Sequence, residues 1–259
     1  MPATPAPRIP AWPPKSAPRL FVEQRLGEGH SVCIEGNAAH YLSRVMRVSP
    51  GDAVILCDNQ TGEWAARAVE AGKRSVTLET VERLRPREAV PDLWLCAALL
   101  KKDRFDLVLE KATELGTARI QPVLTRRCVA DKLNLERART ITVEAAEQCA
   151  RTALPDLAEP LKLDALLRDW PQDRALFFAD EAGGEPAVTA FSGVSKAAIL
   201  TGPEGGFDDA ERAAIRAHPQ ARAISLGPRI LRGETAAIAA LSVWMALAGD
   251  WSHTPAAHE

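Results

Sequence analysis

The sequence lacks the features of disulfide-stabilised, zinc-binding or membrane-spanning proteins. Its five cysteines are scattered, odd in number and without a C-x-x-C pair, which argues against a disulfide framework and a zinc site. No apolar run reaches about 18 residues, the length that a membrane-spanning helix needs. The first 19 residues contain no apolar core of a signal peptide. We therefore expect a cytoplasmic protein with buried free thiols, no membrane contact and no metal.

An excess of basic residues is also missing. Lys and Arg number 32 against 34 Asp and Glu, which gives a formal net charge of −2. Any contact with nucleic acid must therefore come from a local patch. Hydrophobic residues make up 46% of the chain, and 259 residues suffice for one large domain or two small ones.

Proline and turn residues divide the N-terminal third of the chain. Seven prolines within residues 1–18 predict a disordered arm. Residues 19–86 alternate short apolar runs with Gly, Pro and Asn turns, which predicts a small β-barrel-like module with one helix near 37–48. The charged stretch 83–92 contains two prolines and is typical of a linker.

From Leu93 the pattern changes to apolar strands that alternate with helices. We expect strands within 93–100, 118–125, 175–180, 196–202 and 222–227, and helices within 101–116, 134–153, 208–219 and 234–251. Asp103 can cap the first of these helices and Gly116 can end it. This alternation predicts an α/β domain over 90–250, a parallel sheet with helices on both faces, followed by a disordered tail, 251–259.

The stretch LTGPEGGFDDAE, residues 200–211, places three glycines and a proline after an apolar strand. Asp208 and Glu211 then resemble a capping box that starts a helix. The stretch has neither the G-K-[ST] of a phosphate-binding loop nor the G-x-G-x-x-G of a dinucleotide site, and its two acids disfavour a phosphate. A neutral or cationic ligand and a tight turn without ligand both remain open.

A second stretch repeats the scheme. In ISLGPRILRGETAAIAAL, a strand is followed by a Gly-Pro turn, a short loop and an apolar helix. Arg229, Arg232 and Glu234 lie in or next to that loop. The carboxyl ends of parallel strands are where open α/β sheets bind ligands, so both loops are candidates for one site.

These two stretches resemble the signature segments of the SPOUT-type methyltransferases that form N3-methyluridine in bacterial 16S ribosomal RNA, the ribosomal RNA small-subunit methyltransferase E family. The resemblance runs from Arg19 to about Asp250. Further matches are RLFV at 19–22, HYLSRVMRVSPGD at 40–52, KKDRFDLVLEKATELGTARIQP at 101–122 and EAAEQCAR at 144–151.

The resemblance implies a PUA-like RNA-binding barrel over 19–86 and a SPOUT domain with a C-terminal trefoil knot, in a homodimer. The implied cofactor is S-adenosylmethionine, and the implied partner is 16S ribosomal RNA or the small ribosomal subunit. The residues implied to hold the cofactor, chiefly through main-chain groups, are Leu200, Gly202, Glu204, Gly205, Gly206, Leu226, Gly227, Ile230 and Leu231.

The chemistry of the implied reaction needs a cation and a proton acceptor at the target base. We assign Arg232 to the developing uracil oxyanion and Glu234 to orientation or proton removal. Glu234 has an alternative as a helix N-terminal acid. Expected RNA contacts are Arg19, Arg44 and Arg47 in the barrel, and Arg151, for which a helix-surface pair with Glu147 is the alternative.

Two positions depart from the family pattern. Gly233 stands where the family usually has Thr or Ser, and Cys149-Ala150 stands where it usually has Ser-Gly. The first departure removes a hydroxyl next to Arg232. Two other functions therefore remain open: a non-catalytic RNA-binding protein of ribosome assembly, and a SPOUT methyltransferase that acts on another RNA position.

Overall fold

The computed structural model of the protein describes residues 12–251, which divide into two compact units with a boundary between Glu88 and Ala89. Of the predicted arm, 1–18, residues 1–11 lie outside the described part of the chain. Of the predicted tail, 251–259, residues 252–259 lie outside it. Residues 12–18 are ordered, in contrast to the expected disorder. They include a turn in which the Ala17 amide donates to the Pro14 carbonyl at 2.9 Å, and Trp12 lies under the guanidinium of Arg67.

The N-terminal unit is a five-stranded sheet with two short consecutive helical segments. Its elements are β1 (Arg19–Phe21), β2 (Ser31–Glu35), α1 (Gly36–His40), a π-helical turn (Tyr41–Val45), β3 (Ala53–Cys57), β4 (Gly62–Ala71) and β5 (Ser75–Pro86). The strand order is β1-β3-β4-β5-β2, with β1 parallel to β3 and the other pairs antiparallel. Leu42, Val54, Leu56 and Leu78 are among the side chains of its core.

The predicted linker 83–92 begins too early. Strand β5 continues through Pro86, which pairs with Gly62 on β4. A proline is tolerated at a strand end, where its missing N–H breaks no interior ladder bond. Gly62 has φ +112°, and a Cβ there would lie 2.2 Å from the Arg85 carbonyl oxygen, so only glycine allows the two strands to approach this closely.

The C-terminal unit is a parallel eight-stranded sheet with helices on both faces, as the sequence predicts. Its elements are β6 (Leu93–Ala98), α2 (Lys102–Glu114), β7 (Arg119–Leu124), α3 (Leu135–Gln148), β8 (Asp156–Leu157), β9 (Leu161–Lys162), α4 (Leu163–Arg168), β10 (Ala175–Ala179), β11 (Glu185–Pro186), α5 (Ala187–Ala190), β12 (Ala197–Thr201), α6 (Asp209–Ala217), β13 (Ala221–Ser225) and α7 (Gly233–Leu247). The strand order is β11-β13-β10-β12-β6-β7-β8, with β9 also on β7.

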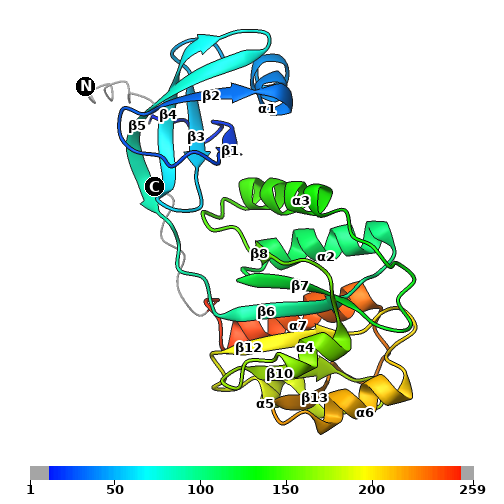
Figure 1. Cartoon of the computed structure of the whole chain (residues 1–259). Coiled ribbons are helices and arrows are strands. Elements are labelled where there is room, and N and C mark those ends of the chain that lie inside the picture. The colour runs from blue at the N-terminus through cyan, green and yellow to red at the C-terminus, as the bar shows by residue number, and fades with distance from the viewer. Residues whose placement is uncertain (1–11, 252–259) are drawn as a thin grey trace, which may run out of the picture. The chain divides into compact units, whose positions relative to one another are not determined.

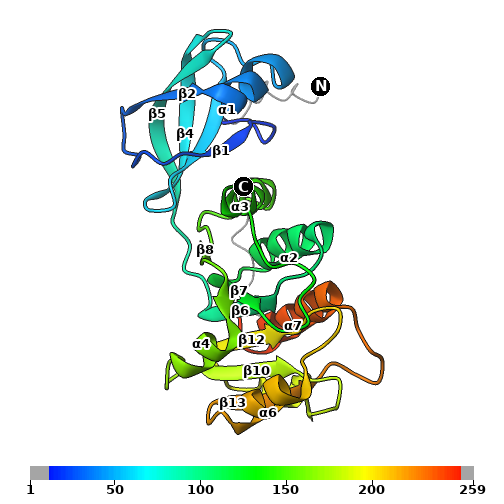
Figure 2. The same cartoon turned by 45° about the vertical axis from the view of Figure 1, so that its right-hand side comes forward.

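Alternate residues of the central strands enter two separate cores. Phe177 and Ile199 pack on the side of α2, α5 and α7. Phe178 and Leu200 pack on the side of α4 and α6. Figures 1 and 2 show α2 and α3 side by side near β7, with α6 next to β13. Burial on both faces explains why these strands are continuous apolar runs in the sequence. Within residues 12–251 every helix is too short or too polar to traverse a bilayer.

Two helix ends differ from the sequence prediction. Asp103 does not cap α2; the helix starts one residue earlier, and the Lys101 amide is instead bonded by Glu204 Oε1 at 3.1 Å. Helix α3 ends at Gln148, because Ala150 adopts φ +60° and turns the chain. Arg151 therefore lies beyond the end of this helix.

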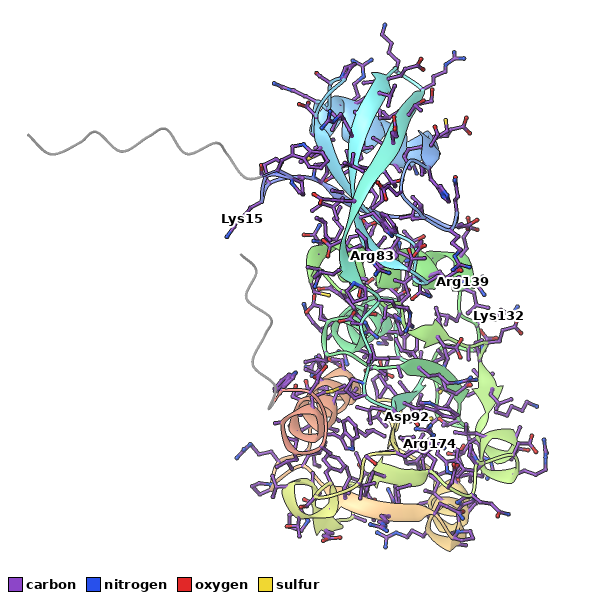
Figure 3. The ribbon with its side chains drawn as sticks, turned by 90° about the vertical axis from the view of Figure 1, so that its left-hand side faces the viewer. Lys15, Arg83, Asp92, Lys132, Arg139 and Arg174 are labelled. Atoms are coloured by element: carbon purple, nitrogen blue, oxygen red, sulfur yellow. The ribbon has the colours of Figure 1, made fainter. Side chains whose placement is uncertain are left out.

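A buried arginine joins the amino ends of three strands. Arg174 donates to the carbonyl oxygens of Asp92 at 2.9 Å and Ala197 at 3.0 Å, and to the Asp92 carboxylate at 2.6 Å. Figure 3 shows the side chains of Arg174 and Asp92 together at this end of the sheet. The guanidinium also covers the ring of Trp94, 3.9 Å from its centroid. These contacts stabilise the sheet edge that lies opposite the candidate site.

Candidate functional site

A cavity of about 650 Å³ opens at the carboxyl ends of β10, β12 and β13. These three strands are neighbours in the sheet, so the loops that follow them meet at one edge. The loops 179–183, 202–207 and 225–233 form the wall, and Arg104 of α2 and Ala236 of α7 complete it. The two glycine stretches singled out in the sequence thus face the same space.

Most of the predicted ligand-holding residues line this cavity. The members found in its wall are Gly202, Glu204, Gly206, Leu226, Gly227, Ile230 and Leu231, together with the predicted catalytic Arg232. Ile230 has 85% of its surface exposed, so it lies at the open rim. The remaining two, Leu200 and Gly205, are not in the wall.

The structure gives Leu200 and Gly205 other positions. Leu200 is fully buried inside β12, where it pairs with Phe178 and Cys96. Gly205 faces away from the cavity: a Cβ there would meet the side chain of Arg127 at 3.4 Å, and its carbonyl accepts from Arg127 at 2.9 Å. Ligand contact stays a prediction for both residues, which lie outside the cavity wall.

Glycine is required at several points of the wall. Gly206 and Gly227 have φ of +66° and +104°, in the left-handed region that other residues rarely adopt. A Cβ at Gly202 would lie 3.2 Å from the ring of Phe207, which is buried under the turn. Glycine here therefore allows the conformation of the loop and keeps the space in front of it free of side chains.

The glycine at the start of α7 brings this helix close to the turn after β12. A Cβ at Gly233 would lie 3.1 Å from the Gly202 carbonyl oxygen and 2.9 Å from Leu100. Glycine in place of the family's usual Thr or Ser at position 233 therefore allows the two loops to pack tightly. A hydroxyl-bearing side chain would need Leu100 or the turn to move.

The turn after β12 is held by a capping box and by Arg126. Asp208 accepts from the Glu211 amide at 2.7 Å, and Glu211 accepts from the Asp208 amide at 3.1 Å, as the sequence predicts. The second Glu211 oxygen accepts from the Arg126 amide at 2.7 Å. The hydrogen bond from the Glu211 amide and the ion pair with Arg126 hold the pKa of Asp208 below its usual value. Both acids thus act inside the loop scaffold.

Glu234 lies directly behind the cavity wall. Its side chain is 12% exposed, and Oε1 lies 3.8 Å from Arg104 Nε. Its Oε2 is buried and has no hydrogen-bond partner among the described residues. A buried unsatisfied carboxylate oxygen is costly and calls for an explanation. Together with Arg104, it marks the place where a polar ligand group would be favoured.

The wall has few groups for covalent catalysis. Within the described part of the chain it contains no His or Cys, and its one hydroxyl, Ser225, is bonded to the Gly227 amide at 3.3 Å. No group of three or more metal-binding side chains occurs between residues 12 and 251.

Several residues of the cavity wall were not predicted from the sequence, among them Arg104, Glu181 and Arg212. Arg104 comes from the first turn of α2, and Glu181 and Arg212 form an ion pair of 2.8 Å at the far wall. The strand before Glu181 was predicted, but the loop after it carries no recognisable motif. Its position at the carboxyl end of a strand between two glycine loops was the only signal that could have found it.

The predicted RNA contacts divide into two groups. Arg44 and Arg47 are exposed at the end of the π-helical turn. Arg19 instead donates to the buried Glu63 at 2.6 Å. Arg151 is 4% exposed and donates to the carbonyls of Thr113 at 2.7 Å and Thr117 at 2.8 Å. RNA contact stays a prediction for all four arginines, and Arg19 and Arg151 also donate to acceptors inside their own units.

The chain is similar to known RNA methyltransferases. Residues 86–245 match the family model described as an RNA methyltransferase domain, and residues 34–81 match an RNA methyltransferase PUA domain. The protein named ribosomal RNA small subunit methyltransferase E of Synechocystis sp. is 34% identical over 212 residues, 78% of this chain and 69% of that protein. The protein of the same name from Rickettsia conorii is 29% identical over 229 residues, which cover 86% of this chain and 93% of that protein.

Solved structures show the same architecture. A methyltransferase of Legionella pneumophila with bound cofactor SAM has a TM-score of 0.82 and 30% identity, covering 90% of this chain and 99% of that one. The ribosomal RNA small subunit methyltransferase E of Neisseria gonorrhoeae, bound to S-adenosyl methionine, has a TM-score of 0.82 and 28% identity, covering 91% and 99%.

Proposed function

The chain belongs to the ribosomal RNA small-subunit methyltransferase E family of RNA methyltransferases, and from this premise we propose that it methylates N3 of a uridine in bacterial 16S ribosomal RNA with S-adenosylmethionine. The observation that carries the proposal is the glycine-walled cavity between the loops after β10, β12 and β13. The bare main chain of these glycine loops supports a bound nucleoside.

The residues of the cavity fit this cofactor. Gly206 and Gly227 keep side chains out of the space at the turns, and main-chain groups of both loops can hold an adenosine. Glu204 and the orphaned oxygen of Glu234 offer negative charge for a cationic ligand. Bound S-adenosylmethionine supplies an electrophilic methyl group on sulfur.

The chain's own residues then act on the target base. N3 lies on the Watson–Crick edge, so the uridine must be unpaired or flipped out before it can react. Arg232, exposed in the cavity wall, stabilises the negative charge that develops on uracil when N3–H loses its proton. Glu234 orients the base or accepts that proton, and Arg104 beside it holds the carboxylate in place.

RNA binding and assembly complete the proposal. The exposed Arg44 and Arg47 support phosphate contact by the PUA-like unit. The partly exposed apolar residues Val243 and Leu247, one turn apart on α7, support a homodimer. Ribosomal RNA or the small ribosomal subunit as substrate implies the cytoplasm, and the trefoil knot stays a prediction from the family.

Mass-spectrometric mapping of methylated nucleosides tests this function. Ribosomal RNA and small subunits from a strain without the gene are treated with the purified protein and S-adenosylmethionine. N3-methyluridine should appear at one position and be absent when the Arg232→Ala variant is used. A different methylated base would instead identify a methyltransferase of other specificity. A folded protein that binds RNA but not the cofactor would be a non-catalytic assembly protein.

A further inference from the structure

The loop after β10 brings a carboxylate to the cavity wall. Glu181 follows the strand by two residues and lines the cavity opposite the loop 225–233. Its Oε1 accepts from Arg212 at 2.8 Å. A Cβ placed on Gly206 would lie only 3.0 Å from the same oxygen. The carboxylate therefore lies directly against the bare backbone of the turn after β12.

An ion-pair network around the buried Asp180 fixes this carboxylate. The Asp180 side chain is 1% exposed and lies 2.6 Å from Arg216 and 3.2 Å from Arg212 Nε. It also accepts from the Ala182 amide at 3.0 Å, which shapes the loop. Asp180 thus orients Arg212 on α6, and Arg212 in turn orients Glu181. A side chain held from two sides loses little further freedom when it binds a ligand.

The charge of Glu181 selects the kind of group that it can bind. Arg212 already balances its negative charge, so attraction to a second cation is weak. An ionised carboxylate has about four acceptor sites and no donor, and Arg212 occupies one of them. A pair of neighbouring hydroxyl groups fits the remaining sites, as acidic residues do with ribose in other nucleotide sites.

We propose that Glu181 binds the ribose 2′- and 3′-hydroxyls of S-adenosylmethionine and so selects a ribonucleoside cofactor. The inference rests on the proposed function, which supplies the cofactor. Glu181 acts here as a binding residue that sets the position of the adenosine. Asp180 and Arg212 act through it as positioning residues.

Calorimetry with matched ligands tests the inference. The ligands are S-adenosylmethionine, S-adenosylhomocysteine, which lacks the sulfonium charge, and the 2′-deoxy form of S-adenosylhomocysteine. The wild-type protein should bind the deoxy ligand about tenfold more weakly than its ribose parent, the loss expected for a hydrogen bond to a charged group. Glu181→Ala should bind S-adenosylmethionine and S-adenosylhomocysteine about tenfold more weakly than the wild type does. The Kd values of this variant for S-adenosylhomocysteine and for its 2′-deoxy form should agree within about twofold.

Two further variants keep the result interpretable. Glu185→Ala is the matched control, since Glu185 is exposed on β11 and outside the cavity wall, and it should bind as the wild type does. Glu181→Gln keeps the shape of the side chain and replaces Glu181→Ala if that variant does not fold.

The outcomes separate the inference from the proposed function. Unchanged affinity in folded Glu181 variants would overturn the inference. So would a loss confined to S-adenosylmethionine, because the carboxylate would then sense the sulfonium. A folded wild-type protein that binds neither ribose ligand would instead refute the proposed cofactor itself.

Discussion

Arg127 donates a hydrogen bond to the carbonyl oxygen of Gly205 at 2.9 Å, and thereby ties the loop after β7 to the glycine turn after β12. A second, longer bond of 3.4 Å reaches the Phe207 carbonyl. The two residues are far apart in the sequence and neither lines the cavity. Their contact determines how firmly the turn that faces the ligand is held.

Removal of the Arg127 side chain should therefore weaken cofactor binding without removing a ligand contact. We expect Arg127→Ala to raise the Kd for S-adenosylmethionine by about three- to tenfold, the range of a solvent-accessible charge-assisted hydrogen bond. Calorimetry measures the change. Lys132→Ala, at an exposed position in the same loop, is the control. An Arg127→Ala affinity equal to that of the control would contradict this role.

Neighbouring glycines of the turn should respond differently to alanine. Gly206 has φ +66°, and its Cβ would lie 3.0 Å from Glu181, so Gly206→Ala carries a backbone cost of about 1–2 kcal/mol and displaces that side chain. Gly205 lacks the positive φ, and its Cβ would meet only Arg127 at 3.4 Å. The Kd should rise markedly for Gly206→Ala and little for Gly205→Ala. The reverse order in calorimetry would show that the turn is built differently.

Arg232 should matter for turnover more than for cofactor affinity. If its guanidinium stabilises the developing uracil oxyanion, Arg232→Ala should lower kcat by about 10²–10³-fold, as loss of one such donor does. The Kd for S-adenosylmethionine should change by less than about threefold. Single-turnover methylation and calorimetry measure the two effects. Equal losses in both would make Arg232 a residue that holds the cofactor, and Arg229→Ala at the same rim is the control.

Arg151 should contribute to stability and not to RNA affinity. Its guanidinium donates to the Thr113 and Thr117 carbonyls at the end of α2, and its loss removes both of these buried, charge-assisted hydrogen bonds. We expect Arg151→Met to lower the free energy of unfolding of the C-terminal unit by about 2–4 kcal/mol. Denaturant unfolding measures this, with Arg139→Met, exposed on α3, as the control. Normal stability with weakened RNA binding would restore the sequence prediction.

The N-terminal unit should lose stability in acid through Asp58. Burial by itself would raise the pKa of Asp58, but hydrogen bonds from the Leu26, Gln60 and Thr61 amides and the Thr61 hydroxyl lower it on balance. A lowered folded-state pKa gives stability that is present above the unfolded value of about 3.9 and lost as pH falls through the folded value. Hydrogen exchange of β1–β5 should show Asp58→Asn less stable than wild type near pH 6.

The same measurement at lower pH checks the sign. The difference between wild type and Asp58→Asn should shrink as the pH falls below about 4. Asp52, exposed and bonded only to the Ser49 amide in the described structure, gives the control Asp52→Asn. A difference that stays constant to pH 3 would mean that the carboxylate charge is not what stabilises the loop.

Much of the fold follows from local sequence signals. The apolar runs at 93–98 and 197–201 became central strands because both their faces are buried, and the capping box of Asp208 and Glu211 formed as its spacing predicts. The helix ends were less predictable. Helix α2 begins before Asp103, and the amide of its N-cap residue Lys101 donates to Glu204, which is distant in the chain.

The roles of single arginines also depended on distant partners. Arg19, Arg44, Arg47 and Arg151 are equally basic in the sequence. Glu63 lies next to Arg19 only because β1 pairs with β3 and β3 with β4. Arg151 turns inward only because Ala150 adopts a left-handed conformation. Exposure, which decides whether an arginine can reach a phosphate, is a property of the packed structure.

The sequence by itself determined the alternation of strands and helices, the two glycine loops and the family, because each of these rests on neighbours in the chain. The tertiary structure decided that β10 lies between β13 and β12. That strand order brings the loop with Glu181 between the two glycine loops, and it completes a cavity whose third wall no local pattern announces. Strand order is set by burial of both sheet faces over the whole domain, and so it cannot be read from any one segment.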